Sequence, residues 1–414
     1  MRSLYNLSLA TALVFAGSAQ AENKGFFIVT NKADENSVVG YQADDSGIYK
    51  ISGEYSTGGK GTGDLEIPDL KKDPSHPLAN GDDPLISANS LSMTADGRYL
   101  AVVNPGDATV SLMSIDAEGA LNVVNTVDAP DQFPISLAFH DNLLAVAGVG
   151  MNNSAGSIGM YQIVDGKLQP VAGSLRDLKA RPSTIAFSST GDFVIVNELV
   201  TGEVKIFGVQ GGSLSAEPVS QVSSPRDAAD RFQAIPVGFA VSGDTILMSE
   251  ARFLTPDFML RKGNGEVALS PLYSWQTGSL STYKLSPNGA VSLVSGDVLT
   301  GDGVESGEIA NCWVAVLHDG TTLWAANALS SSISSFRIRE NGTAALLNAR
   351  AFKDPSETLF FSDIEVSADG SEIYQLVGNR GQVMVFSILS NGDLELKQTI
   401  GGLPELGTYG LVVY

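Results

Sequence analysis

Residues 90–127, SLSMTADGRYLAVVNPGDATVSLMSIDAEGALNVVNTV, carry four short apolar runs separated by three turn signals. The first turn is Asp96-Gly97 and the third is Glu118-Gly119, and both dipeptides suit the tight turns of β-hairpins because glycine tolerates positive φ. The pattern predicts one four-stranded antiparallel meander. A lone sheet of this kind leaves an apolar face uncovered, so we expect it to pack against copies of itself or another layer.

The same unit recurs along the chain with a period of roughly 45 to 55 residues outside insertions. Further units begin near Pro134, Pro182, Pro236, Cys312 and Ser362. The most regular marker is the third turn, and it occurs seven times, at Ser46-Gly47, Glu118-Gly119, Asp165-Gly166, Gly211-Gly212, Asn288-Gly289, Asn341-Gly342 and Asn391-Gly392.

The two ends of the chain carry complementary incomplete units. The first unit has only three strands, Gly25–Asn31, Ser37–Gln42 and Ile48–Tyr55, and the chain ends in one lone strand, TYGLVVY, at Thr408–Tyr414. The sequence therefore predicts an all-β fold, a seven-bladed β-propeller of four-stranded antiparallel blades whose first blade is completed by the C-terminal strand. A solenoid is the alternative, but it would not explain the complementary ends.

Composition limits the classes of function. Hydrophobic residues make up 43% of the 414 residues and charged residues 17%, as in a packed globular chain. The net charge of -21 argues against nucleic acid and anionic lipid as partners. The lone cysteine, Cys312, cannot form an internal disulfide, so the fold relies on packing.

The first 21 residues resemble a cleaved export signal, with Arg2, an apolar core at Leu9–Phe15, and small residues at Ala19 and Ala21. We expect a secreted or periplasmic protein without membrane insertion. Residues 22–414 are predicted to form a single propeller domain, interrupted by a polar connection at 58–89 and an insertion at 252–277 in the fifth blade.

Three phrases carry a resemblance to a known family: VNEL at Val196–Leu199, MSEA at Met248–Ala251, and NCWVAVLHDGTTLWAANALSSSISSF from Asn311. The chain resembles the secreted branch of the seven-bladed lactonase propellers, which groups 6-phosphogluconolactonase-like and carboxymuconate-lactonizing-like proteins. The resemblance implies a ligand site at the mouth of the central channel, with hydrolysis or formation of a lactone as the chemistry.

The histidine expected at that mouth in the muconate-lactonizing type has no clear counterpart. His140 and His318 lie in hairpins between the first and second strands of their units, which point to the opposite face, and His76 lies in the polar connection. A histidine base is therefore not predicted.

Four polar residues are predicted to be equivalent, because each lies seven residues after the glycine of a first turn: Asn104, Glu198, Glu250 and Asn327. Each ends a second strand on the mouth side. Asparagine suits such a turn, whereas glutamate does not. Two carboxylates sharing one rim would supply an acid and a base, so Glu198 and Glu250 are the predicted catalytic pair, with solvated rim charges as the alternative.

Other groups are predicted to bind substrate at the same rim. Arg181, Arg231 and Arg252 could hold a substrate carboxylate or a developing oxyanion, and Asn104, Asn327 and Trp313 complete the predicted contacts. In the insertion, Phe253, Phe258, Tyr273 and Trp275 could cover the channel or stack on a ring.

No cofactor is predicted. The competing use of Glu198, Glu250, Asn104 and Asn327 is a Ca²⁺ site, since all four offer oxygen ligands.

Two functions from different classes remain open on the sequence. The first is hydrolysis or formation of a lactone of a sugar acid or an aromatic-derived acid. The second is a non-catalytic propeller that binds a protein or glycan at the same rim.

Overall fold

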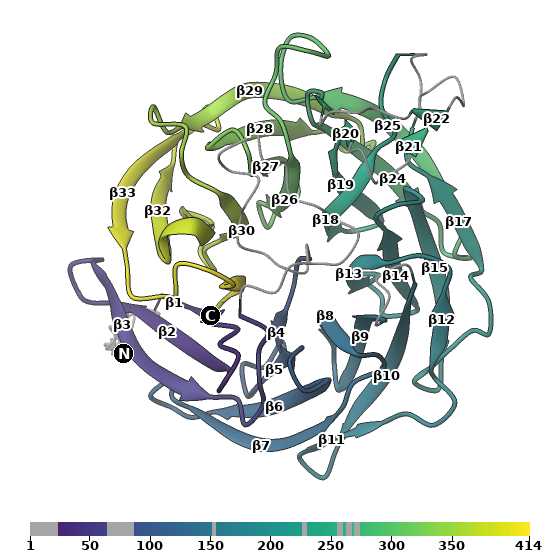
Figure 1. Ribbon diagram of the computed structural model, residues 1–414, viewed down its shortest axis with the longest axis vertical. Helices are drawn as coiled ribbons and strands as arrows, with labels where there is room; N and C mark the ends of the chain where they lie inside the picture. The colour runs from purple at the N-terminus through teal and green to yellow at the C-terminus, as the bar shows by residue number, and fades with distance from the viewer. Residues whose placement is uncertain are drawn as a thin grey trace, which may run out of the picture.

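Seven antiparallel sheets stand like blades around a central axis in the computed structural model (Figure 1). It describes residues 24–63, 87–150, 155–225, 230–254, 260–261, 267–268 and 274–414. The predicted leader at 1–21, His76, Phe258 and Tyr273 lie outside these residues. The predicted seven-bladed propeller is confirmed.

The first three blades contain the following strands, each blade being given from the axis outward. Blade 1 is β34 (Tyr409–Val413), β1 (Gly25–Val29), β2 (Ser37–Ala43) and β3 (Tyr49–Ser56). Blade 2 is β4 (Leu91–Met93), β5 (Tyr99–Asn104), β6 (Thr109–Ile115) and β7 (Leu121–Asp128). Blade 3 is β8 (Phe133–His140), β9 (Leu143–Val149), β10 (Gly156–Val164) and a two-piece outer strand, β11 (Lys167–Pro170) and β12 (Arg176–Leu178).

The other four blades follow the same order around the ring. Blade 4 is β13 (Pro182–Phe187), β14 (Phe193–Glu198), β15 (Glu203–Gln210) and the pieces β16 (Ser213–Leu214) and β17 (Ser220–Ser223). Blade 5 is β18 (Ile235–Ser242), β19 (Thr245–Ala251), β24 (Ser279–Leu285) and β25 (Val291–Leu299). Blade 6 is β26 (Asn311–Val316), β27 (Thr322–Asn327), β28 (Ser332–Ile338) and β29 (Ala344–Lys353). Blade 7 is β30 (Phe361–Val366), β31 (Glu372–Val377), a 3₁₀ turn (Gly378–Arg380), β32 (Gln382–Ile388) and β33 (Leu394–Ile400).

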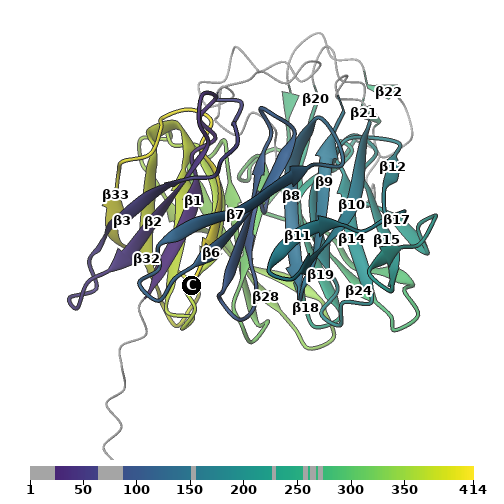
Figure 2. The same ribbon diagram turned by 90° about the horizontal axis from the view of Figure 1, so that it is seen from below.

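The insertion of blade 5 adds two small ladders on one face of the ring. β20 (Phe253–Leu254) pairs with β23 (Ser274–Trp275), and β21 (Leu260–Arg261) pairs with β22 (Val267–Ala268). We call this face, uppermost in Figure 2, the top face. The top face carries the loops between the second and third strands of each blade and the connections between blades. The hairpin loops between first and second strands, and between third and fourth strands, lie on the opposite, bottom face.

Burial explains why these segments form strands at these places. The second strand of a blade has neighbours on both faces, so β5 is buried along almost its whole length, whereas the outer strand β7 is mostly exposed. The seven predicted third turns all place their glycine at positive φ, which other residues adopt at a cost of about 1 kcal/mol: Gly47, Gly119, Gly166, Gly212, Gly289, Gly342 and Gly392.

The core consists of apolar layers between neighbouring blades. Phe239 of blade 5 packs with Ile195 of blade 4, and Leu280 of blade 5 packs with Leu323 of blade 6. Each blade thus buries its two faces against its neighbours, which is how a single unit that cannot fold alone becomes stable in the ring.

The ring closes between its first and last segments. β34 pairs with β1 as the innermost strand of blade 1, and the Tyr414 ring stacks on Phe27 with 4.5 Å between centroids. Gly410, at φ 74, donates its N–H to Asp363 of blade 7 at 2.8 Å. Tyr49 of blade 1 also donates its hydroxyl to Glu372 of blade 7 at 2.6 Å.

The chain that enters blade 2 reaches across the axis near the top face. Ala88, just before β4, packs near Gly238 of β18 on the far side of the ring. The carbonyl of Ser87 accepts a hydrogen bond from the Trp313 indole of β26 at 2.8 Å. Residues 87–88 therefore cross the axis to blades 5 and 6. No helix in the described part of the chain is long and apolar enough to cross a membrane.

Candidate functional site

The four residues predicted to be equivalent occupy one ring of positions, which we call the top ring. Asn104, Glu198, Glu250 and Asn327 each end the second strand of their blade, on the side of the top face, and all are 0% exposed. Glu250 is the last residue but one of its strand, since β19 continues to Ala251. The predicted register is right, but the side chains lie between blades and not on an open rim.

The two asparagines of the top ring hold the loop that follows them. Asn104 donates to Ser111 at 2.8 Å and accepts from Thr57 at 2.7 Å. Asn327 donates to Ser332 at 3.2 Å and Ser334 at 2.9 Å. The bonds to Ser111, Ser332 and Ser334 join each asparagine to the third strand of its own blade, and the bond from Thr57 joins Asn104 to blade 1, so both residues have a structural role at the turn.

Glu198 has both of its carboxylate oxygens engaged inside blade 4. Lys205 of β15 donates to Oε1, and the Thr201 hydroxyl donates to Oε2 at 2.8 Å. The Lys205 side chain is only 5% exposed. A buried carboxylate with both oxygens paired in this way is held in one orientation.

Glu250 is also ion-paired, but only through one oxygen. Its Oε2 accepts from Arg252 at 2.8 Å and from the Ser279 hydroxyl at 2.7 Å. Its Oε1 has no hydrogen-bond partner in the described part of the chain. Buried acceptors are nearly always paired, so such an oxygen marks a place for a water or for a polar group of a ligand.

Two further hydroxyls lie in the same region between blades 4 and 5. Tyr283 of β24 lies close to the hydroxyl of Ser224. Burial, followed by the negative charge of Glu250, raises the pKa of Tyr283 well above its usual range. The tyrosine therefore stays a neutral hydroxyl that can donate a hydrogen bond.

The predicted arginines Arg231 and Arg252 belong to a buried network with Glu250. Both are 0% exposed and both contact Asp297 of β25, Arg231 at 2.8 Å and Arg252 at 3.1 Å. Burial alone would raise the pKa of Asp297, but hydrogen bonding from Arg231 and the charge of Arg252 outweigh it and hold that pKa below its usual value. The alternating charges compensate one another inside the protein.

The same network joins three segments of the top face. Arg231 lies on the connection between blades 4 and 5, and it also donates to the carbonyl of Thr277 at 2.7 Å. Arg252 donates to the carbonyl of Phe232 at 2.8 Å. The two arginines thus fasten the connection and the insertion to blade 5.

The remaining predicted contacts are packed into the top face. Arg181, directly before β13, is 0% exposed, and its carbonyl accepts from the Leu199 N–H at 3.0 Å. Trp313 is 2% exposed and contacts the chain that crosses the axis. Phe253 and Trp275 stack with 4.5 Å between ring centroids on the β20–β23 ladder.

The alternative of a shared Ca²⁺ site requires the four top-ring residues to converge. In the described residues they belong to four different blades and share no hydrogen-bond partner. Nor do three or more His, Cys, Asp or Glu side chains gather at one point in those residues. His140 and His318 lie in or beside bottom-face hairpins, as predicted.

A carboxyl group that the sequence reading missed lies on the innermost strand of blade 7. Ile364 and Val366 pack toward blade 6, so Glu365 between them faces the other side of β30, where Asp363 binds β34. The side chain is partly exposed, and the burial of the rest of it, followed by the charge of Asp363, raises the pKa of Glu365 to about 8. The sequence does contain a signal for this residue, because the equivalent position of the innermost strand is an alanine in blades 3, 4 and 5: Ala138, Ala186 and Ala240.

Replacing Glu365 by Gln should stabilise the protein at alkaline pH. The folded protein holds this proton more tightly than the unfolded chain, whose glutamate titrates near 4.5, so Glu365 weakens the fold progressively as pH rises from about 4.5 to 8. We expect the free energy of unfolding of Glu365→Gln to exceed that of the parent by roughly 2–4 kcal/mol above pH 8 and by little at pH 4.5. Urea unfolding at both pH values measures it.

Glu395→Gln on the exposed face of β33 is the matched control, and it should give no such pH-dependent gain. An equal gain in the free energy of unfolding at pH 4.5 and pH 8.5 for Glu365→Gln would contradict the raised pKa of Glu365 in the folded protein.

Comparison with known proteins adds solved structures of the same fold. A candidate 6-phosphogluconolactonase of Bacteroides fragilis aligns over 96% of this chain and 99% of its own, with a TM-score of 0.64 and 14% identity. A periplasmic gluconolactonase of Pseudomonas aeruginosa aligns over 95% and 99%, with a TM-score of 0.62 and 15% identity. The likeness is one of fold. No family model and no curated protein matches the sequence.

The resemblance to lactonase-type propellers is therefore confirmed for the architecture. A second candidate 6-phosphogluconolactonase, from Bacteroides uniformis, aligns over 95% of this chain and 100% of its own with a TM-score of 0.62 and 15% identity. Identities at this level do not carry activity or substrate from one chain to another.

Proposed function

We propose that this lactonase-like propeller acts on a lactone of a sugar acid or an aromatic-derived acid, at the top face over blade 5. The observation that carries the proposal is Oε1 of Glu250, which lies in a buried polar site next to an arginine and has no hydrogen-bond partner among the residues that the structure describes. Solved propellers of the same fold that bear lactonase names support the substrate class.

In this proposal Glu250 is the acid–base residue and Arg252 positions it. Hydrolysis requires one water to attack the lactone carbonyl while its proton passes to Oε1 of Glu250, and the same proton then goes to the ring oxygen as the C–O bond breaks. Lactone formation is the reverse sequence. Arg252 holds Oε2, so that Oε1 keeps a fixed direction. The neutral hydroxyl of Tyr283 can donate a hydrogen bond in the same region.

The two predicted catalytic glutamates should separate in a kinetic test. We expect Glu250→Gln to lower kcat by about 10²- to 10⁴-fold with KM largely kept, because the proton acceptor is lost and the shape is retained. Glu198→Gln should leave kcat near the parent value, since Lys205 and Thr201 occupy both of its oxygens. The measurement is kcat for the parent and both variants on the lactone that a panel of sugar and aromatic lactones identifies.

Melting curves of each variant check that it is folded, and a chelator control tests for a metal requirement. Parental kcat in Glu250→Gln would remove Glu250 from the mechanism. Loss of activity in Glu198→Gln without loss of folding would return the role to Glu198.

A second candidate function is a non-catalytic propeller that binds a protein or glycan at the top face. It is favoured by the complete burial of Glu250, which limits access for a substrate, and by residues 87–88, which cross the axis. If no lactone in the panel is turned over, this function is the better one.

We also propose that the protein works outside the cytoplasm, as a secreted or periplasmic protein. The export-type sequence at residues 1–21 supports this location. The periplasmic gluconolactonase of Pseudomonas aeruginosa shows that a protein in that compartment can have this fold.

A further inference from the structure

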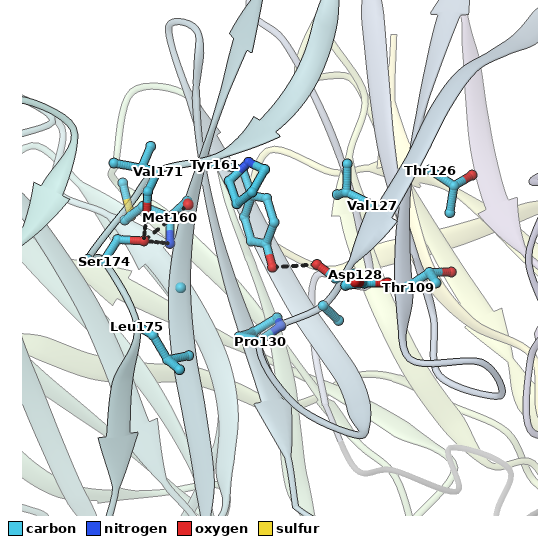
Figure 3. A pocket seen from close by; sticks show the side chains of 14 residues that line it. Thr109, Thr126, Val127, Asp128, Pro130, Met160, Tyr161, Val171, Ser174 and Leu175 are labelled. Carbon is cyan, nitrogen blue, oxygen red and sulfur yellow. Dashed lines mark hydrogen bonds between the residues drawn. The ribbon is translucent and has the colours of Figure 1, made fainter.

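A cavity of about 560 Å³ opens between blades 2 and 3, with none of the top-ring residues in its lining. Met160 and Tyr161 of β10 form its floor, and both are almost fully buried. Val127 and Asp128 of β7 form the facing wall, and Figure 3 shows Tyr161 between them and the blade-3 residue Val171. Its volume is within the range of small-molecule sites.

The cavity exists because the outer strand of blade 3 is interrupted. β11 ends at Pro170 and β12 begins at Arg176, so residues 171–175 leave the sheet. Ser174 fixes this loop, accepting from the Met160 N–H at 3.0 Å and donating to the Val171 carbonyl at 2.7 Å. Hydrogen bonds thus hold the wall in place, and the cavity is a built feature of the blade.

The polar groups of the cavity offer a ligand hydrogen-bond acceptors and few hydrogen-bond donors. The Tyr161 hydroxyl donates to the backbone carbonyl of Asp128 at 2.8 Å, and Ser174 is used by the loop. The carboxylate of Asp128 remains at the exposed edge, and the lining residues that the structure describes include no Lys, Arg or His. A ligand with a donor or a positive charge would be complementary.

Two neighbouring carboxylates reinforce that preference. Asp107 accepts from the lining residue Thr109 at 2.8 Å, and Asp131 directly follows the lining residue Pro130. None of Asp107, Asp128 and Asp131 forms an ion pair with another described residue. With a net charge of -21 on the chain, the field at the entrance attracts cations.

We propose that this cavity binds a small amphipathic cation, with an ammonium group beside Asp128 and an apolar body against Tyr161 and Met160. Val127, Pro130 and the half-exposed Leu175 supply the remaining apolar surface. Burying that body drives binding, and the carboxylate gives the preference for positive charge.

Three probes of matched shape test the proposal: 4-phenylbutylammonium, the neutral 4-phenylbutanol and the anionic 4-phenylbutyrate. Calorimetric titration of the full-length protein at low ionic strength should show the ammonium binding most tightly, the alcohol more weakly and the carboxylate weakest. Asp128→Asn should weaken the ammonium by about twofold to fivefold and leave the alcohol unchanged. Asp141→Asn, which removes an equally negative and 86% exposed side chain elsewhere, should change neither.

A blocking variant locates the site. Thr126→Trp places a large side chain at the exposed edge of the cavity and should weaken all three probes. The proposal is overturned if no probe binds, if the carboxylate binds as tightly as the ammonium, or if Asp128→Asn keeps the preference. Unchanged binding to Thr126→Trp would place the site elsewhere. None of these results depends on lactone turnover.

Discussion

Deletion of Thr408–Tyr414 is expected to abolish folding. The deleted segment contains β34, the innermost strand of blade 1. Its Tyr409 is buried against blade 2 and its Leu411 against blade 7. Without it, the N–H and C=O groups of β1 lose their partner and an apolar edge is opened to water. Circular dichroism and size exclusion of the truncated protein measure the effect.

Single substitutions on the same strand supply a graded control. Leu411 is 3% exposed, so Leu411→Asp should be severely destabilising, whereas Val413→Thr, at a partly exposed position, should change the melting temperature little. A truncated protein that melts within a few degrees of the parent would show that β34 is dispensable and that the ring does not depend on this strand.

Replacing Arg252 by Met is expected to lower the free energy of unfolding by about 3–5 kcal/mol. The methionine is of similar length but leaves Glu250 as a buried charge without its arginine, and Asp297 with Arg231 alone. It also removes the bond to the Phe232 carbonyl. Urea unfolding gives the value.

The exposed pair Lys50–Asp44, 2.7 Å apart, is the matched control, and Lys50→Met should change the free energy of unfolding little. Combining Arg252→Met with Glu250→Gln should recover part of the loss, since the uncompensated charge is gone. A loss for Arg252→Met no larger than that for Lys50→Met would mean that the buried network does not stabilise the fold.

Local pattern was sufficient to predict the architecture. Turn glycines such as Gly119 and Gly289 depend only on backbone sterics, and the alternation of strands such as Tyr99–Asn104 depends on burial by adjacent blades, so both can be read from nearby residues. The equivalence of Asn104, Glu198, Glu250 and Asn327 followed from a fixed spacing within each blade. Spacing of this kind is conserved by the geometry of a repeated unit.

The environment of those residues could not be predicted in the same way. Glu250 is neutralised by Arg252, two residues away, but that network is completed by Asp297 and Arg231, which are distant in the sequence. The chain at Ser87 that meets Trp313 is separated from it by more than two hundred residues. Whether a polar side chain faces water or the interior depends on such long-range contacts, which no local pattern contains.

The closure of blade 1 by the last strand has a consequence for biosynthesis. The chain is made from its N-terminus, so β1 is complete long before its partner, which comes 380 residues later in the register Ile28↔Leu411 to Val29↔Tyr409. Throughout that interval the growing chain presents an unpaired, wholly apolar edge, GFFIV, to its surroundings. We therefore expect stalled translation products to be more prone to aggregate than the finished protein.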